Sequence, residues 1–97
     1  MKKLVAIAAI MTLSSGAFAA DVAAGKTKSA VCAGCHGPAG VSSNPLWPNL
    51  AGQHDQYIIK QLKAFKDGTR KDPLMSPMAA PLTDADMENL AAYFSSL

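Results

Sequence analysis

Apolar residues recur at helical spacing in the middle of the chain. Ile58, Leu62 and Phe65 are spaced i, i+4 and i+7, which places them on one face of a helix. Gly68 follows this stripe, and glycine readily adopts the left-handed conformation at the end of a helix. The pattern therefore predicts an amphipathic helix over residues 55–67 that ends just before this glycine.

A second apolar stripe lies at the end of the chain, and polar residues mark where its helix begins. Thr83 is a preferred N-cap residue, and Asp86, three positions later, approximates a capping box. These two residues predict that the last helix begins directly after Thr83. The positions expected to be buried on this helix are Met87, Leu90, Phe94 and Leu97, with Tyr93 beside them.

The remaining pattern predicts one more helix and two long loops. Asp21 is a suitable N-cap for a helix from about residue 22 to 33. Residues 34–49 are rich in Gly, Pro, Ser and Asn, and residues 68–82 contain three prolines, so both are expected to be irregular. No segment alternates apolar and polar residues convincingly, as a strand would. The fold is predicted to be all-α, with about three main helices. Its long loops are expected to wrap around a bound group.

The N-terminal segment has the organisation of a secretory signal peptide. Two lysines precede an apolar run over residues 4–13, and small residues then lead to an Ala-Phe-Ala cleavage site. An apolar run of about ten residues is shorter than the roughly twenty that a membrane-spanning helix needs. We therefore expect residues 1–19 to be removed after Ala19 and residues 20–97 to form one periplasmic domain. A retained N-terminal anchor is the alternative.

Cleavage would change the charge balance. The full chain has 9 basic and 7 acidic residues, a formal net charge of +2. Loss of Lys2 and Lys3 leaves 7 of each, which argues against nucleic-acid binding because that function needs a basic stripe. So small an exported domain has a marginal core, and a large apolar cofactor would stabilise it.

The two cysteines of the chain lie in the sequence VCAGCHGPAG at residues 31–40. Cys32, Cys35 and His36 form C-x-x-C-H, the signature of covalent haem attachment. Cysteines three apart at a helix end lie on one face and can reach both vinyl groups of one haem, and the next residue can place its imidazole on the iron. A zinc site would need four ligands, and His54 is the only further histidine. A thioredoxin-type dithiol would need a βαβ pattern, so one haem c is favoured.

The motif leaves the opposite side of the iron open. Methionine sulfur and histidine nitrogen are the usual protein ligands there. Met87 belongs to the predicted buried stripe, and His54 is expected to lie at the surface near the start of a helix. The two methionines of the second loop, Met75 and Met78, are therefore the stronger candidates. Ser76 and Pro77 between them suit the N-cap and first position of a short helical turn.

Further motifs follow C-x-x-C-H in a fixed order: W-P-N-L-A-G-Q at residues 47–53, the segment 57–68, M-S-P-M at 75–78 and L-T-D at 82–84. This ordered set resembles a bacterial class I cytochrome c, most closely a single-haem unit of the cytochrome c4 type. The resemblance covers nearly all of residues 20–97. It implies a small all-α fold wrapped around one haem that is attached through two cysteines.

The resemblance also implies roles for individual residues. In similar proteins the ligand methionine stands eight positions before the cap of the last helix, which selects Met75, and Met78 would then point into the core. The carbonyl of Pro48 is expected to accept a hydrogen bond from the ring of His36, which fixes the orientation of the ring.

Gly25 is similar to the family's small residue at which the first and last helices cross. The side chain of Tyr93 or Phe94 is then expected to pack on it.

The function implied is electron transfer rather than catalysis. Iron with His and Met ligands has no open position for a substrate and changes oxidation state with little rearrangement. We expect a monomeric carrier between membrane respiratory complexes, such as a reductase or a terminal oxidase, that is loaded with haem by a cytochrome c maturation system. The alternative is a haem-based ligand sensor or a peroxidase-like unit with a labile methionine bond. Basic residues suited either to steering partners or to a solvated face are Lys26, Lys28, Lys60, Lys63, Arg70 and Lys71.

Overall fold

The computed structural model describes residues 20–97, and the predicted signal peptide with its cleavage site lies outside the described residues. Within residues 20–97 there is no strand, so the all-α prediction is confirmed. None of the helices in this range is long and apolar enough to cross a membrane. In chain order the elements are α1 (Val22–Lys28), the 3-10 turn η1 (Ser29–Val31), α2 (Ala33–His36), α3 (Asp55–Asp67), α4 (Met75–Ala79) and α5 (Asp84–Ser95).

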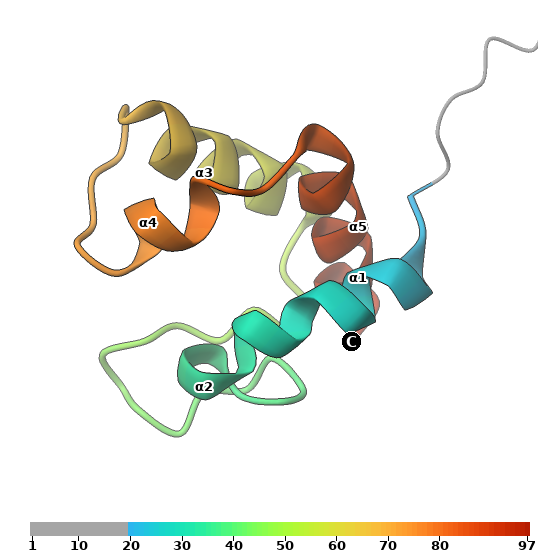
Figure 1. The fold of residues 1–97 in the computed structure, drawn as a ribbon. Coiled ribbons are helices and arrows are strands. Elements are labelled where there is room, and N and C mark those ends of the chain that lie inside the picture. The colour runs from blue at the N-terminus through green and yellow to red at the C-terminus, as the bar shows by residue number, and fades with distance from the viewer. Residues whose placement is uncertain (1–19) are drawn as a thin grey trace, which may run out of the picture.

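The first and last helices cross at Gly25, as expected (Figure 1). A methyl group at this buried position would collide with the backbone carbonyl of Asn89 and would lie 2.9 Å from Cβ of Tyr93. Only glycine permits so close an approach of two backbones. The backbone N–H of Asp21 donates a hydrogen bond of 2.9 Å to Oδ1 of Asn89. The crossing therefore joins the two ends of the domain by packing and by a hydrogen bond.

Side-chain caps fix where α1 and α5 begin, and both caps were predicted. Oδ1 of Asp21 accepts from the backbone N–H of Ala24 at 3.1 Å. At α5, Oγ1 of Thr83 accepts from the N–H of Asp86 at 3.1 Å, and the Asp86 carboxylate accepts from the N–H of Thr83 at 3.0 Å. The hydrogen bond from Thr83 holds the pKa of Asp86 below its ordinary value. Lys28, at the end of α1, lies 3.7 Å from the same carboxylate.

The core lies where α5 packs against α3. Ile58 and Phe65 of α3 are buried, as their spacing predicts. Leu97 is 47% exposed, so its predicted burial is wrong; α5 ends at Ser95, and the last residues no longer follow the buried face. The side chains that form the core are Ile58, Phe65, Ala79, Leu82, Met87, Leu90, Ala91, Tyr93 and Phe94.

The segment predicted as one helix over residues 22–33 consists of three shorter pieces. Ser29 explains the change, because its hydroxyl donates to the carbonyl of Lys26 at 2.6 Å and competes with the regular helical pattern. Its own carbonyl accepts from the N–H of Cys32 at 2.8 Å, an i to i+3 bond typical of a 3-10 turn. The chain then re-enters a helix, α2, that ends at His36, so the first long loop begins later than predicted.

Two groups of elements are joined by α5. Figure 1 shows α3 and α4 together on one side, α2 with the loop that follows it on the other, and α1 across α5. The loops after α2 and after α3 both extend toward the left of this view. The fold therefore brings the C-x-x-C-H segment and the M-S-P-M segment, far apart in sequence, to the same side of the molecule.

Gly25→Ala is expected to lower the free energy of unfolding by about 1–3 kcal/mol, because the added methyl group pushes α1 away from α5. Chemical denaturation of the purified protein, followed by far-ultraviolet circular dichroism, measures the loss. Gly34→Ala is the matched control, since a methyl group there meets no atom within 4 Å. It should leave stability unchanged or slightly raised. Equal stability of Gly25→Ala and wild type would contradict the close crossing.

Candidate functional site

The C-x-x-C-H motif forms one helical turn, in which Cys32 directly follows η1 and the other four residues form α2. The backbone N–H groups of His36 and Cys35 both donate to the carbonyl of Cys32, at 2.9 and 3.3 Å. Gly37 then ends α2 at a φ of 85°, where any side chain would collide with the backbone of Val41. The turn therefore presents two sulfur atoms about one helical turn apart, with the histidine directly after the second.

The two cysteines are free thiols that differ in exposure: Cys32 is half-buried and Cys35 is exposed. Burial, together with the neighbouring Cys35, raises the pKa of the Cys32 thiol. A redox dithiol depends on a lowered thiol pKa, so the thioredoxin-type alternative gains no support. Within residues 20–97 no group of three or more His, Cys, Asp and Glu side chains is placed to hold a metal ion. The zinc alternative therefore gains no support either.

His36 is buried, and its orientation is fixed by a single hydrogen bond. Nδ1 of the ring lies 2.7 Å from the carbonyl oxygen of Pro48, the contact that the sequence predicts. A carbonyl oxygen can only accept, so Nδ1 carries the proton and donates it. The other ring nitrogen, Nε2, then keeps its lone pair and is available to bind a metal ion.

Hydrogen bonds within the long loop hold the Pro48 carbonyl in place. The N–H of Ala51 donates to the carbonyl of Gly40 at 3.0 Å. In the same loop, the N–H of Ser42 donates to Oδ1 of Asn49 at 2.7 Å. These contacts were not predicted, because they join positions seven or more apart in a segment without periodicity. These hydrogen bonds within the loop hold the segment that carries the Pro48 carbonyl, which is the acceptor for His36.

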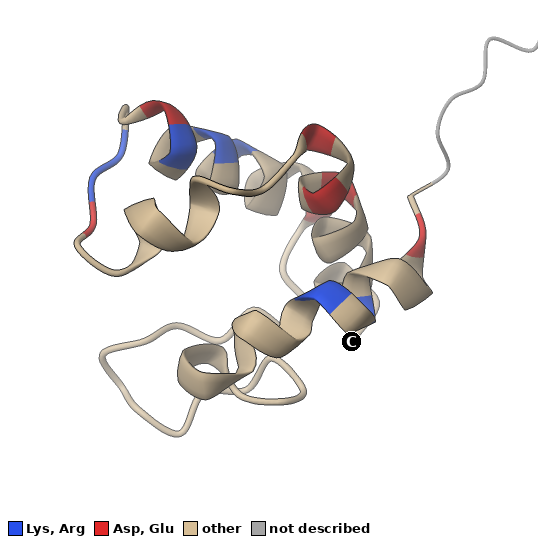
Figure 2. Ribbon diagram, in the orientation of Figure 1, with Lys and Arg blue, Asp and Glu red and all other residues tan. Residues whose placement is uncertain are grey.

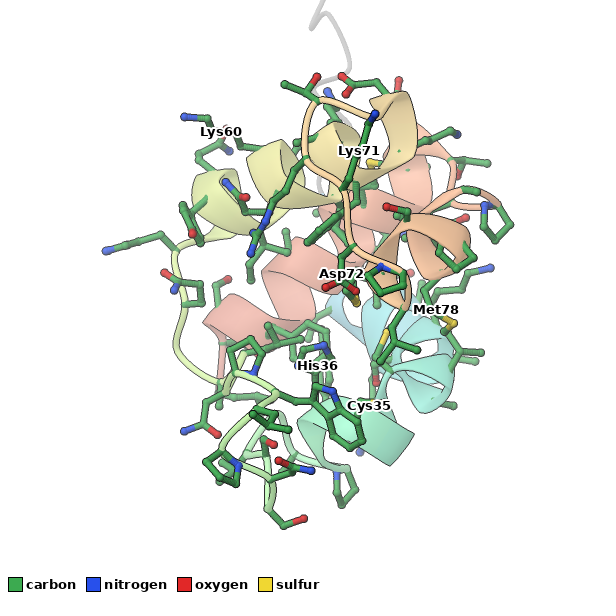
Figure 3. All side chains as sticks on the ribbon, turned by 90° about the vertical axis from the view of Figure 1, so that its left-hand side faces the viewer. Cys35, His36, Lys60, Lys71, Asp72 and Met78 are labelled. Carbon is green, nitrogen blue, oxygen red and sulfur yellow. The ribbon has the colours of Figure 1, made fainter. Side chains whose placement is uncertain are left out.

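The two candidate methionines of α4 differ in burial. Met75 is half-buried and packs against the core. Met78 is 41% exposed, so the prediction that it points into the core is wrong. Ala79, which lies four residues after Met75 on the same helical face, is the fully buried residue of α4 instead. Figure 3 shows Met78 on the α4 side and His36 on the α2 side of one face of the molecule.

Asp72 fixes the start of α4. Its Oδ1 accepts from the N–H groups of Leu74 and Met75 at 2.8 and 2.9 Å, and its own N–H donates to Oγ of Ser76 at 3.0 Å. The bonds from Met75 and Leu74 hold the pKa of Asp72 below its ordinary value. The predicted cap of Ser76 followed by Pro77 is wrong, because Ser76 lies inside α4. The N-cap of α4 is Leu74, and Asp72 lies two residues before it, in a turn that the sequence pattern did not single out.

The other two candidate ligands lie where the sequence predicts. His54 is exposed and precedes α3, where its side chain makes no capping hydrogen bond. Met87 is completely buried in the core on α5. Neither observation favours a role in binding a metal ion.

Several large apolar side chains are exposed on the segments around α2 and α4. Groups of exposed apolar side chains in soluble proteins mark surfaces that a ligand or a partner covers. A haem is a large, flat and mostly apolar ring that needs two thiols, an available imidazole nitrogen and apolar neighbours, and these residues fit it. The exposed side chains are Val31, Val41, Leu46, Leu74 and Met78.

Comparison with known proteins gives matches over nearly all of the described domain. A family model described as cytochrome c matches residues 22–97. Cytochrome c4 of Thiocapsa roseopersicina is 52% identical over 77 residues, which cover 78% of this chain and 40% of that protein. Cytochrome c-554(548) of Halomonas halodenitrificans is 46% identical over 81 residues, which cover 80% of this chain and 98% of that protein.

Solved structures give a similar result. The structure of cytochrome c4 from Acidithiobacillus ferrooxidans matches with a TM-score of 0.77 and 41% sequence identity, covering 87% of this chain and 54% of that chain. This chain therefore spans about half, or less, of the length of the cytochrome c4 proteins that it matches. It spans nearly the whole of the Halomonas protein.

Proposed function

The chain belongs to the cytochrome c family, and from this we propose that it is a periplasmic one-electron carrier, not an enzyme. One haem c would be attached through thioethers to Cys32 and Cys35. His36 and Met75 would ligate its iron from opposite sides. The bound haem supplies an iron that alternates between the ferrous and ferric states, and the protein residues hold that iron in one coordination.

The hydrogen bond between His36 and Pro48 is the observation that carries this proposal. It sets the tautomer of the imidazole, so that Nε2 is the nitrogen available to the iron. It also fixes the plane of the ring and raises the basicity of the ligand. Only 6% of His36 is exposed, which keeps water from competing for the same hydrogen bond.

Met75 is proposed as the second ligand. Its backbone is held at the start of α4, and its side chain packs against the core, so the sulfur has few alternative positions. Met78 is more exposed and lacks this support. With both axial positions taken by protein ligands, the iron has no site for a substrate, which suits electron transfer better than catalysis.

The partners would be membrane respiratory complexes, such as a reductase or a terminal oxidase, and a maturation system would attach the haem. Figure 2 shows Lys and Arg residues along α3, in the loop after it and at the end of α1, and acidic residues on the first turns of α5 and at the end of α3. Two of these basic side chains have structural contacts: Nζ of Lys66 donates to the carbonyl of Leu82 at 2.5 Å, and Arg70 stacks on the ring of Phe65. Lys60 and Lys63 are exposed and would steer an acidic partner.

Haem attachment is tested by mass and by extraction. The intact purified protein is expected to be heavier than residues 20–97 by the mass of one haem. Acidified acetone, which removes non-covalent haem, should leave this haem on the protein because thioether bonds hold it. The double variant Cys32→Ala, Cys35→Ala should release whatever haem it binds, whereas Cys35→Ala should retain it through one bond. Release of haem from the wild type would contradict covalent attachment.

The assignment of Met75 is tested by the absorption spectrum of the ferric protein. Met75→Ala is expected to abolish the weak sulfur-to-iron charge-transfer band, because the variant has no sulfur at that position. Met78→Ala is the matched control and should keep the band at the wild-type intensity. A band that persists in Met75→Ala would contradict the assignment. Rapid carbon monoxide binding by the reduced wild type would instead favour a ligand sensor or a peroxidase-like unit.

A further inference from the structure

We propose that Asp72 is a positioning residue for the distal iron ligand. Through hydrogen bonds to the turn that leads into α4, it holds the backbone of Met75 where the sulfur can stay on the iron. The inference rests on the proposed function, in which Met75 is that ligand. It requires no contact between Asp72 and the haem, since Asp72 acts through the backbone of the ligand.

The hydrogen bonds of Asp72 hold Met75 and the residue on each side of it. The carboxylate oxygen Oδ1 accepts from the N–H of Met75 itself and from that of Leu74, at 2.9 and 2.8 Å. On the far side, the N–H of Ser76 donates to the carbonyl of Asp72 and Oγ of Ser76 accepts from the N–H of Asp72, each at 3.0 Å. Four bonds from one residue therefore fix the turn of chain that carries the sulfur.

A helix as short as α4 depends on the turn that precedes it more than a long helix does. It has 5 residues, and a first helical turn is costly to form because several backbone angles are fixed for each hydrogen bond gained. The N–H of Met75, the first residue of α4, and that of its N-cap Leu74 have no acceptor within the helix, and Oδ1 of Asp72 accepts from both. Pro73 adds to the effect, since its ring restricts the backbone of the turn before the helix.

Asp72 acts mainly as a hydrogen-bond acceptor. The positive charge of Arg70 acts on its carboxylate, but the ion pair found among residues 20–97 joins Lys28 and Asp86 and does not include Asp72. Figure 3 shows Asp72 on the same side of the face as Met78, across from Cys35 and His36. A neutral side chain with an oxygen in the same place should therefore replace the carboxylate.

Imidazole binding to the ferric, haem-loaded protein measures how often Met75 leaves the iron. Imidazole binds only when that position is open, so its apparent affinity scales with the open fraction. Asp72→Ala is expected to raise the affinity about fivefold, the change in an equilibrium constant that accompanies the loss of a typical hydrogen bond. Asp72→Asn should restore the wild-type affinity, because its side-chain oxygen can accept the same two hydrogen bonds. Ser76→Ala removes the reciprocal bond and should raise the affinity about twofold.

Asp67→Ala is the matched control. Asp67 lies at the end of α3 and accepts from the N–H of Thr69 at 2.8 Å, a local bond like those of Asp72 but without a link to α4. The imidazole affinity of the Asp67→Ala variant should equal that of the wild type. Amide hydrogen exchange at Met75 should be faster in Asp72→Ala and unchanged in Asp67→Ala, which gives a readout independent of the iron.

Equal imidazole affinities for Asp72→Ala and wild type would overturn the positioning role. So would a failure of Asp72→Asn to restore the affinity, because the negative charge would then be the property that matters. If Asp72→Ala does not accumulate, an unchanged affinity in Ser76→Ala overturns the role on its own. A charge-transfer band that persists in Met75→Ala would overturn the ligand assignment itself, so the two failures are distinguishable.

Discussion

The hydrogen bond from the ring of His36 to the carbonyl of Pro48 is the contact on which the rest of the site depends. A buried imidazole without a partner would be destabilising, and with the other tautomer it would present the wrong nitrogen to the iron. The carbonyl is held by a loop that closes on Gly40, whose position is itself limited by the side chain of Phe94. Because Phe94 is a core residue of α5, the orientation of the His36 ring is fixed by the core of the domain.

The distal side is built on weaker constraints. Its proposed ligand, Met75, lies on a helix of 5 residues that packs on α3 and follows a turn held by the Asp72 carboxylate. Local opening occurs first where few buried contacts and short elements hold the chain. The two proposed ligands are therefore held unequally: His36 by a loop fastened to the core, and Met75 by a capped turn. An electron carrier with the two ligands proposed needs both bonds to persist in both oxidation states, and the turn at Asp72 is the weaker of the two supports.

Much of the fold could be predicted from the sequence because its determinants are local. The apolar spacing of α3 and the capping box of α5 each lie within a few residues, and the C-x-x-C-H motif lies within five. The hydrogen bond of Pro48 could be expected only from resemblance to a family, since a loop proline has many uses. The 3-10 turn at Ser29 was missed because a serine hydroxyl competes with the helix in a way that apolar spacing does not show. The prediction that Met78 is buried was wrong, because α4 packs on α3 with Ala79 as its buried residue, and the sequence of so short a helix does not show which face is covered.

Proton NMR of the reduced, diamagnetic protein tests the central claim, ligation by His36 and Met75, most directly. A methionine bound to haem iron lies over the porphyrin face, where the ring current shifts its side-chain protons far upfield. We expect Met75, assigned through its backbone connectivity, to show these shifts and Met78 to show ordinary ones. We also expect a slowly exchanging Nδ1 proton on His36, protected by its hydrogen bond to Pro48. Upfield shifts at Met78, or at no methionine, would contradict the account.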